Sequence, residues 1–170
     1  MRGPFVGREG ELNELAEVVA SAKAGATPSA AVVIGAPGSG KSRLLSEIIN
    51  RLQPPVLRVT GYEPEQAVPL TAARELLRTL SRVPIHGVAL EAVAFGEQQW
   101  GQAGAPLRLF EAAYRCLADS EPVTLVIDDL QWVDDVSAAL VSYLVRASQT
   151  DGVSLALLSA GRPRALSGPR

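Results

Sequence analysis

Hydrophobic residues recur along the chain in two kinds of pattern, and each kind predicts a different element. Residues 9–23 place leucine, valine and alanine at helical spacing, which predicts an amphipathic helix, and the sequence GATPS at 25–29 breaks the pattern. The run AAVVIG at 30–35 is short, continuous and rich in β-branched residues. Such a run is typical of a strand buried on both faces of a parallel sheet.

A second helix and a second strand follow. Residues 44–52 carry one helical stripe of leucine and isoleucine, and Pro54 and Pro55 end it. The sequence VLRVTG at 56–61 has the β-branched composition of a strand. The first part of the chain therefore reads as helix, strand, helix, strand.

The C-terminal part repeats this alternation. The runs PVTLVIDD at 122–129 and VSLALLSAG at 153–161 predict two strands. Between them, residues 134–148 predict a helix that Asp134 or Asp135 caps. Strands that alternate with helices predict an α/β fold with a parallel sheet flanked by helices.

The middle of the chain has a weaker pattern. Residues 69–83 predict a helix, and the Gly- and Gln-rich residues 96–106 predict a loop. We expect His86 to lie in a turn or to face solvent, since no partner stands at a recognisable spacing. Cys116 lies on the apolar face of a predicted helix at 109–120, which favours a buried, inert thiol.

Composition and charge narrow the function classes. A chain of 170 residues with 47% hydrophobic residues is long enough for one domain with a substantial core. The net charge of -2 lacks the basic footprint of a nucleic-acid binder, so we expect no direct nucleic-acid partner. No segment has the roughly 18 consecutive apolar residues of a membrane span, and the N-terminus lacks the apolar core of a signal peptide. We therefore expect a cytoplasmic protein with no membrane partner.

The first strand is followed directly by a phosphate-binding (Walker A) motif. Eight consecutive residues fit the pattern GxxxxGK[ST]: Gly35, Ala36, Pro37, Gly38, Ser39, Gly40, Lys41 and Ser42. Glycines let successive N–H groups turn inward toward an anion, and the helix that follows directs its positive end at the same anion. Lys41 is predicted to reach the β- and γ-phosphates, and the Ser42 hydroxyl to bind Mg²⁺. The predicted ligands are ATP and Mg²⁺.

Two carboxylates end the strand at 122–129, as in a Walker B motif. Asp128 is predicted to hold Mg²⁺ through its water shell, and Asp129 to orient or deprotonate the attacking water. Paired acids at a strand end also occur as helix caps or in solvated turns. The complete phosphate loop about ninety residues earlier favours the catalytic interpretation.

Four segments together carry a family resemblance: PFVGREGELNEL, GAPGSGKSRLL, LVIDDLQWVDDVSAALVSYL and LALLSAGR, which span residues 5–162. The combination resembles the AAA-like P-loop ATPase domain of STAND-type signal-transduction NTPases. It is most similar to the ATPase domain near the N-terminus of large bacterial LuxR-type regulators, which is also found attached to cyclases and protein kinases.

The resemblance assigns further residues to the site. Val6, Gly7 and Arg8 are implied to line the adenine side, and Arg162 to act as a sensor near the γ-phosphate. Alternatively, the VGRE segment is a helix start with an acidic first turn, and Arg162 is a surface arginine. The implied catalytic set is Lys41, Asp129 and Arg162, and the nucleotide-binding set extends from the loop to Arg43.

The family also implies a domain plan and a strand order of 5-1-4-3-2. The whole chain, 1–170, is interpreted as one ATPase domain without the fifth strand, the helical lid or the winged helix, so a DNA-binding function is not carried over. Its predicted segments are the N-terminal helix (1–29), the phosphate-loop unit (30–61), an irregular insertion (62–105), the Walker B and sensor strands (106–162) and a tail (163–170). The phosphate-loop strand is then expected at an open edge that invites self-association.

Three functions remain in view. The first is an ATP-binding module with Mg²⁺-dependent ATPase potential in a signal-transduction or transcriptional regulator, with ATP or ADP and regulator domains as partners. The second is a non-hydrolysing interaction module or a fragment of a larger regulator. A small-molecule phosphotransferase ranks third, because the sequence has no evident arginine-rich lid to clamp a second substrate.

Overall fold

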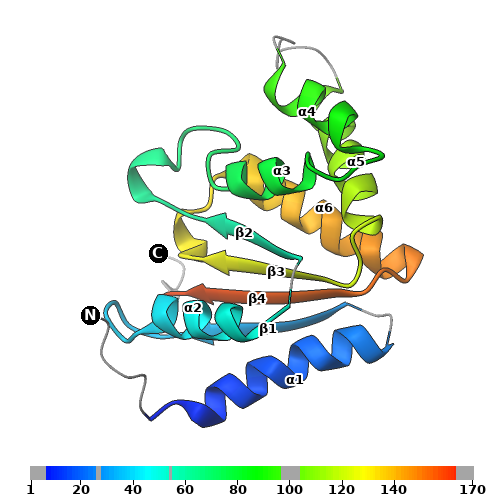
Figure 1. Ribbon diagram of the computed structural model, residues 1–170. Helices are drawn as coiled ribbons and strands as arrows, with labels where there is room; N and C mark the ends of the chain where they lie inside the picture. Colours follow the sequence, from blue (N-terminus) through cyan, green and yellow to red (C-terminus); the bar gives the residue numbers. More distant parts are fainter. Residues whose placement is uncertain (1–6, 26–27, 54, 97–103, 164–170) are drawn as a thin grey trace.

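A four-stranded parallel sheet is the framework of the chain (Figure 1). The computed structural model describes residues 7–25, 28–53, 55–96 and 104–163. Its strands follow the order β1-β4-β3-β2. They are β1 (Ser29–Ile34), β2 (Val56–Thr60), β3 (Val123–Asp128) and β4 (Leu155–Gly161). The predicted α/β class and the relative order of these four strands are confirmed.

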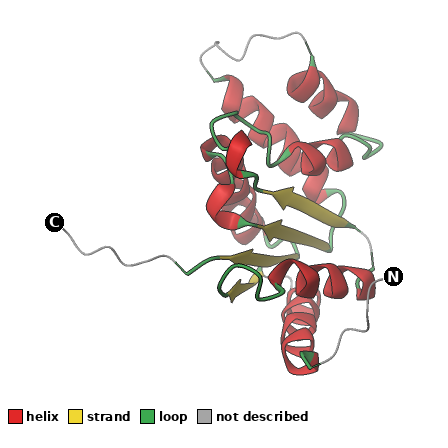
Figure 2. Cartoon of the chain, turned by 90° about the vertical axis from the view of Figure 1, so that its left-hand side faces the viewer, coloured by secondary structure: helices red, strands yellow, loops and turns green. Residues whose placement is uncertain are grey.

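Helices cover both faces of the sheet, as Figures 1 and 2 show from two directions. The helices are α1 (Glu9–Gly25), α2 (Lys41–Arg51), α3 (Arg74–Leu80), α4 (Gly87–Phe95), α5 (Ala105–Ala118) and α6 (Asp135–Asp151). Two short 3-10 turns, η1 (Glu63–Glu65) and η2 (Leu130–Trp132), follow β2 and β3. Helices α1 and α2 pack on one face, α3, α5 and α6 on the other, and α4 packs on α3 and α5.

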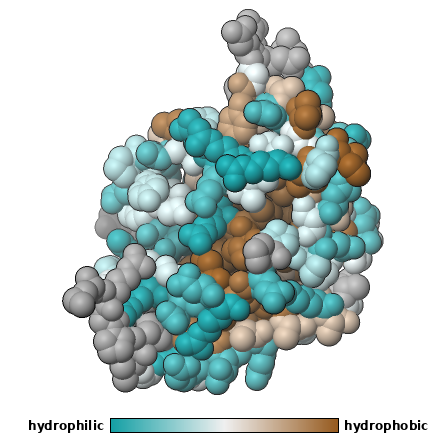
Figure 3. Space-filling model, viewed as in Figure 1, coloured by the Kyte–Doolittle hydropathy of each residue, from teal (hydrophilic) through white to brown (hydrophobic). Residues whose placement is uncertain are grey.

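The core consists of two hydrophobic clusters, one on each face of the sheet. On β3, Leu125 and Ile127 belong to the larger cluster, while Val126 between them belongs to the smaller one. A central strand buried on both faces needs hydrophobic residues at successive positions, which explains the continuous run in the sequence. Figure 3 shows a hydrophobic band bordered by polar side chains on the face of the molecule seen in Figure 1. No helix in the described ranges combines the length and the hydrophobicity that crossing a membrane requires.

Strand β1 departs from the predicted burial. The sequence predicts a strand buried on both faces, but Val32 and Ile34 are 57% and 64% exposed. In the described sheet β1 pairs only with β4, and the face that carries these two side chains is left open. The opposite face packs Ala31 and Val33 against the smaller cluster. The apolar run therefore marks an edge strand with one open face.

The middle of the chain is more helical than its sequence suggests. Residues 62–105, expected to be irregular apart from one helix, contain both α3 and α4. The helix predicted over 69–83 begins only at Arg74, because the backbone N–H groups of Leu70 and Ala72 donate to the side chain of Asp134 instead of entering a helix. Part of the predicted loop at 96–106 lies outside the described residues.

His86 and Cys116, which lie outside the predicted site, have roles in packing and polar contacts of the fold. His86 precedes α4, and its Nδ1 lies 2.6 Å from Asp119 Oδ2, a partner 33 positions away. Cys116 lies fully buried in α5, and burial raises the pKa of its thiol to about 11. The predicted burial of the thiol is confirmed, and the raised pKa favours the unreactive thiol form at neutral pH.

Asp134 joins α6 to the segment before α3. It is the N-cap of α6 and is 2% exposed. Its carboxylate accepts hydrogen bonds from Ser137 N (2.9 Å), Ser137 Oγ (2.6 Å), Leu70 N (2.8 Å) and Ala72 N (3.1 Å). Burial is the largest single influence and raises the pKa, but the hydrogen bonds together hold the pKa of Asp134 below its ordinary value.

We expect the Asp134→Asn variant to lose about 2 to 4 kcal/mol of unfolding free energy at pH 7, because an amide turns a donor toward N–H groups that need an acceptor. The folded pKa is depressed, so the contribution of Asp134 is complete above about pH 4 and is lost as the pH falls through the folded pKa. The difference between wild type and variant should therefore narrow in acid. Urea unfolding of wild type and variant at pH 7 and at a pH below about 4 tests this. Asp135→Asn, at an exposed neighbouring aspartate, is the control. Equal midpoints for the two variants at pH 7 would contradict it.

Candidate functional site

The glycine-rich loop connects the carboxyl end of β1 to the first turn of α2. Gly38 and Gly40 have φ angles of 78° and 83°, in the left-handed region that glycine enters without strain. Gly40 is the N-cap of α2, and within the described residues no side chain caps this helix end by a hydrogen bond. The first turn of α2 contains no acidic residue. The positive end of α2 is therefore suited to an anion.

Close packing inside the loop involves Gly35, Ser39 and Lys41. A Cβ atom on Gly35 would lie 2.6 Å from Ser39 Oγ, so a larger residue does not fit without rearrangement. Lys41 is 8% exposed, and its Nζ donates to the carbonyls of Gly35 and Ala36, both at 2.9 Å. The ammonium group is thus held against the loop itself, beside the start of α2.

Ser42 and Asp128 come together from different elements. Ser42 lies in the first turn of α2, Asp128 ends β3, and both line a cavity of about 70 Å³ together with Thr60 at the end of β2. Hydroxyl and carboxylate oxygens suit Mg²⁺. The described residues contain no group of three or more His, Cys, Asp and Glu that could hold a metal. These two oxygens therefore fit a Mg²⁺ ion that takes its other ligands from phosphates and water.

Asp129 starts the η2 turn directly after β3. Its φ angle is 51°, in the left-handed region that aspartate tolerates better than most residues, and its carbonyl accepts from Trp132 N at 2.8 Å. Its carboxylate Oδ1 accepts from Gln131 Nε2 at 2.9 Å. The end of β2 packs against this turn, since a Cβ on Gly61 would lie 2.5 Å from the Asp129 carbonyl oxygen. The backbone conformation of the turn and its hydrogen bonds therefore hold Asp129 next to Asp128.

Arg162 follows β4 and reaches the same turn. Its backbone N–H donates to Gln131 Oε1 at 3.1 Å, and its guanidinium carbon lies 5.6 Å from the centre of the Trp132 ring. Gln131, Trp132 and Gly61 are contacts that sequence reasoning missed. For Gln131 and Trp132 the signal in the sequence is LQW directly after the paired acids, and for Gly61 it is the glycine that ends the strand run VLRVTG.

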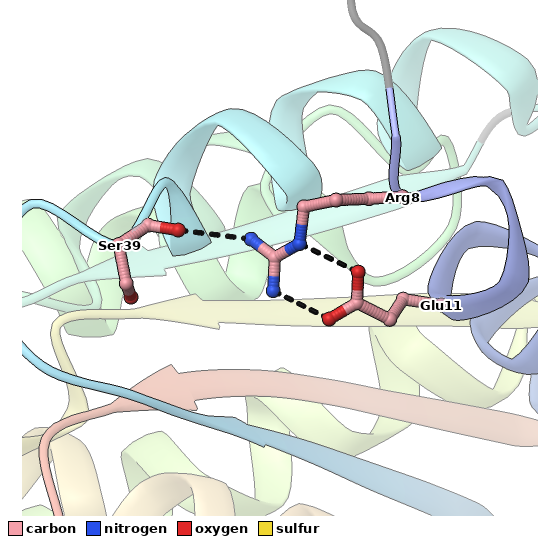
Figure 4. A network of polar contacts seen from close by, with 3 residues as sticks. All are labelled: Arg8, Glu11 and Ser39. Carbon is pink, nitrogen blue, oxygen red and sulfur yellow. Dashed lines mark hydrogen bonds and ion pairs between the residues drawn. The ribbon is translucent and has the colours of Figure 1, made fainter.

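Arg8 extends from the N-terminal segment to the glycine loop, as Figure 4 shows. Its Nη1 donates to the Ser39 carbonyl at 3.1 Å, while Nε and Nη2 bond the two carboxylate oxygens of Glu11 at 2.6 Å. The hydrogen bond with Arg8 lowers the pKa of Glu11, which keeps the pair charged. The structure therefore brings Arg8 against the loop.

Three further predicted site positions lie beside the loop or outside the described residues. Gly7 is exposed with a φ angle of 93°, next to Arg8. Arg43 is exposed in the first turn of α2. Val6 lies outside the described residues, so its predicted contact with adenine stays a prediction.

The other cavities differ in lining and position. One of about 460 Å³ adjoins the site and is lined by Val32, Ile34, Leu130, Gln131, Gly161 and Arg162. Cavities of about 320 and 560 Å³ lie along α3, and none of the predicted site residues lines them. The predicted residues that the structure describes lie instead at one edge of the sheet, where the carboxyl ends of the parallel strands meet.

The AAA ATPase domain family matches residues 4–158. Among solved structures, a chain in "Structure of Drosophila ORC bound to AT-rich DNA and Cdc6" is similar with 13% sequence identity and a TM-score of 0.43 over 92% of this chain. The present chain spans 50% of the length of that one. No curated protein matches. On the family match, which covers most of its length, the chain belongs to the AAA ATPase domain family.

Proposed function

We propose that the chain binds ATP or ADP together with Mg²⁺ and has Mg²⁺-dependent ATPase potential. The observation that carries the proposal is the meeting of Ser42 and Asp128 in one small cavity directly beside the glycine loop. A phosphate-binding helix end and a hydroxyl and a carboxylate that line one cavity beside it can serve the same ligand, a metal-bound polyphosphate. Membership of the AAA ATPase domain family supports a nucleotide-binding module.

The loop and Lys41 bind the phosphates in this proposal. N–H groups at the start of α2 donate to phosphate oxygens, and Lys41 exchanges its two loop carbonyls for the β- and γ-phosphates. Ser42 and Asp128 hold Mg²⁺, Asp128 through a water of its shell. When bound, the ion neutralises the charge that develops on the transferred phosphoryl group.

Asp129 and Arg162 are proposed to act on the reacting end of the nucleotide. Asp129 orients the attacking water and accepts its proton, and Arg162 senses the γ-phosphate from the end of β4. Gly7 and Arg8, with Val6, border the adenine side. The contact of Arg8 with Ser39 supports this assignment, since it joins the N-terminal segment to the phosphate loop.

We further propose that this single ATPase domain is the cytoplasmic nucleotide-binding part of a bacterial signal-transduction or transcriptional regulator of the STAND and LuxR type. The support is the set of sequence segments around VGRE, the glycine loop and DDLQWVDD. A non-hydrolysing interaction module is the alternative. An ATPase module and a non-hydrolysing module both bind nucleotide and differ in turnover. Separate assays of binding and hydrolysis therefore distinguish them.

Saturating ATP or ADP with Mg²⁺ is expected to raise the melting temperature by about 5 to 10 °C. A ligand that binds only the folded state at a hundredfold excess over Kd adds about 2.7 kcal/mol, and 1 kcal/mol corresponds to about 2 to 4 °C for a chain of this size. Lys41→Ala should remove most of the shift in a thermal-melt assay. Lys23→Ala is the matched control, because Lys23 is the only other lysine and lies in the last turn of α1. An unchanged melting temperature for folded wild-type protein in millimolar nucleotide would refute nucleotide binding.

The two acids should differ when each is changed to asparagine. Asp128→Asn removes the carboxylate proposed to hold the metal through a water and should weaken Mg²⁺-dependent ATP affinity about tenfold or more, since second-sphere contacts to bound metals contribute about 10- to 100-fold. Asp129→Asn should leave the affinity within about twofold and reduce single-turnover hydrolysis by about 10² to 10⁴. Equilibrium dialysis and a single-turnover assay provide the two readouts. Equal losses of affinity in both variants would be inconsistent with separate roles.

The open edge of β1 supports a proposal of self-association. Val32 and Ile34 expose apolar side chains on a strand whose other edge pairs with β4, and unpaired edges of this kind recruit other chains. Ile34→Lys should therefore increase the monomer fraction in sedimentation velocity, because a lysine on an edge strand opposes pairing. Ile85→Lys, at a residue 77% exposed before α4, is the control. A wild-type chain that is already monomeric at high concentration would rule this association out.

A further inference from the structure

Gln131 lies between two residues of the proposed catalytic set and contacts both. Its Nε2 donates to Asp129 Oδ1 at 2.9 Å, and its Oε1 accepts from the backbone N–H of Arg162 at 3.1 Å. A carboxylate at neutral pH only accepts hydrogen bonds, and a backbone N–H only donates them. The chemistry of the two partners therefore fixes which way the amide points.

The turn that carries Gln131 follows β3 and is contacted from the segment after β2 and from the end of β4. Its backbone carbonyl accepts from Gln66 Nε2, in the segment after β2, at 3.3 Å. On the β4 side, a Cβ on Gly161 would lie 3.4 Å from Gln131 Oε1, so the strand end approaches the amide closely. The side chain itself is half-buried, which limits exchange of its partners with water.

The Asp129 carboxylate depends on this amide. In the described part of the chain, the hydrogen bond from Gln131 is the one that its carboxylate accepts. The neighbouring acid, Asp128, instead accepts from the Asp129 backbone N–H at 2.9 Å. With a φ angle of 51° at Asp129, the backbone determines where the side chain starts, and among the described residues the Gln131 amide is the hydrogen-bond donor that meets its carboxylate.

We propose that Gln131 is a positioning residue that holds the Asp129 carboxylate in the orientation needed to activate water and ties that orientation to the end of β4. The inference rests on the proposed function, since Asp129 has this role only if bound nucleotide is hydrolysed. Because Gln131 bonds the backbone of Arg162, a displacement of Arg162 changes the position of the amide and with it the carboxylate of Asp129.

Two substitutions of Gln131 remove either the donor alone or both hydrogen bonds of the amide. Gln131→Glu keeps an acceptor for the Arg162 N–H but replaces the donor toward Asp129 with a second carboxylate oxygen. Gln131→Met keeps the length of the side chain and loses both hydrogen bonds. Gln66→Met is the control, because the exposed hydrogen bond of Gln66 goes to the backbone carbonyl of Gln131 and not to the amide that meets Asp129.

ATP affinity and hydrolysis rate at saturating ATP are measured for each protein, together with its melting temperature. We expect affinity within about twofold of wild type and a rate lower by about tenfold to a hundredfold in both Gln131 variants, as for a misplaced catalytic group. Gln66→Met should retain the rate. In an Asp129→Asn background, Gln131→Met should cost no further rate, because a double-mutant cycle removes a coupling once one partner is gone.

The outcomes distinguish the inference from the function on which it rests. A wild-type chain that binds no ATP refutes the proposed function. A chain that binds ATP without hydrolysing it overturns the role of Gln131 and leaves binding intact. A wild-type rate in folded Gln131→Glu or Gln131→Met, or an equal loss from Gln131→Met with and without the Asp129→Asn change, likewise overturns it.

Discussion

The parallel direction of all four strands is the constraint on which the site depends. Parallel strands end at the same edge of a sheet, and binding sites of open α/β sheets lie beyond those carboxyl ends. The pairing of β1 with β4, β4 with β3 and β3 with β2 therefore brings together the glycine loop, Asp128 and Arg162, which lie far apart in the sequence. A single antiparallel strand in this sheet would carry its terminal residue to the opposite edge.

Short contacts between loops then set the positions at this edge more finely. Gly61 lets the end of β2 approach the turn after β3, and Gly35 leaves room for Ser39 within the glycine loop. Asp134 fixes the start of α6 and draws the segment before α3 against it through buried hydrogen bonds. A buried carboxylate destabilises the fold unless several donors bond to it. Loss of some of the donors to Asp134 would therefore weaken the whole connection between α6 and the segment before α3.

The sequence predicted those features that depend on residues close together along the chain. The glycine loop, the paired acids and the strand runs are local patterns, and each was found where the pattern indicated. It did not predict contacts between distant segments, such as His86 with Asp119 or Gln131 with Arg162, because spacing along the chain carries no information about them. The family strand order placed β1 at an edge, as observed, but the exposed face of β1 was missed, because an apolar run has the same composition whether one face of the strand is covered or both.

The central claim is that the glycine loop, Ser42 and Asp128 form one site for a metal-bound nucleotide. Electron paramagnetic resonance with Mn²⁺ in place of Mg²⁺ tests it most directly, by counting the protein-bound ions with and without ATP. Two protein oxygens hold such an ion weakly, so the account predicts stoichiometric Mn²⁺ binding only when ATP is present. Equal Mn²⁺ binding without nucleotide, or tight ATP binding with no bound metal, would contradict it.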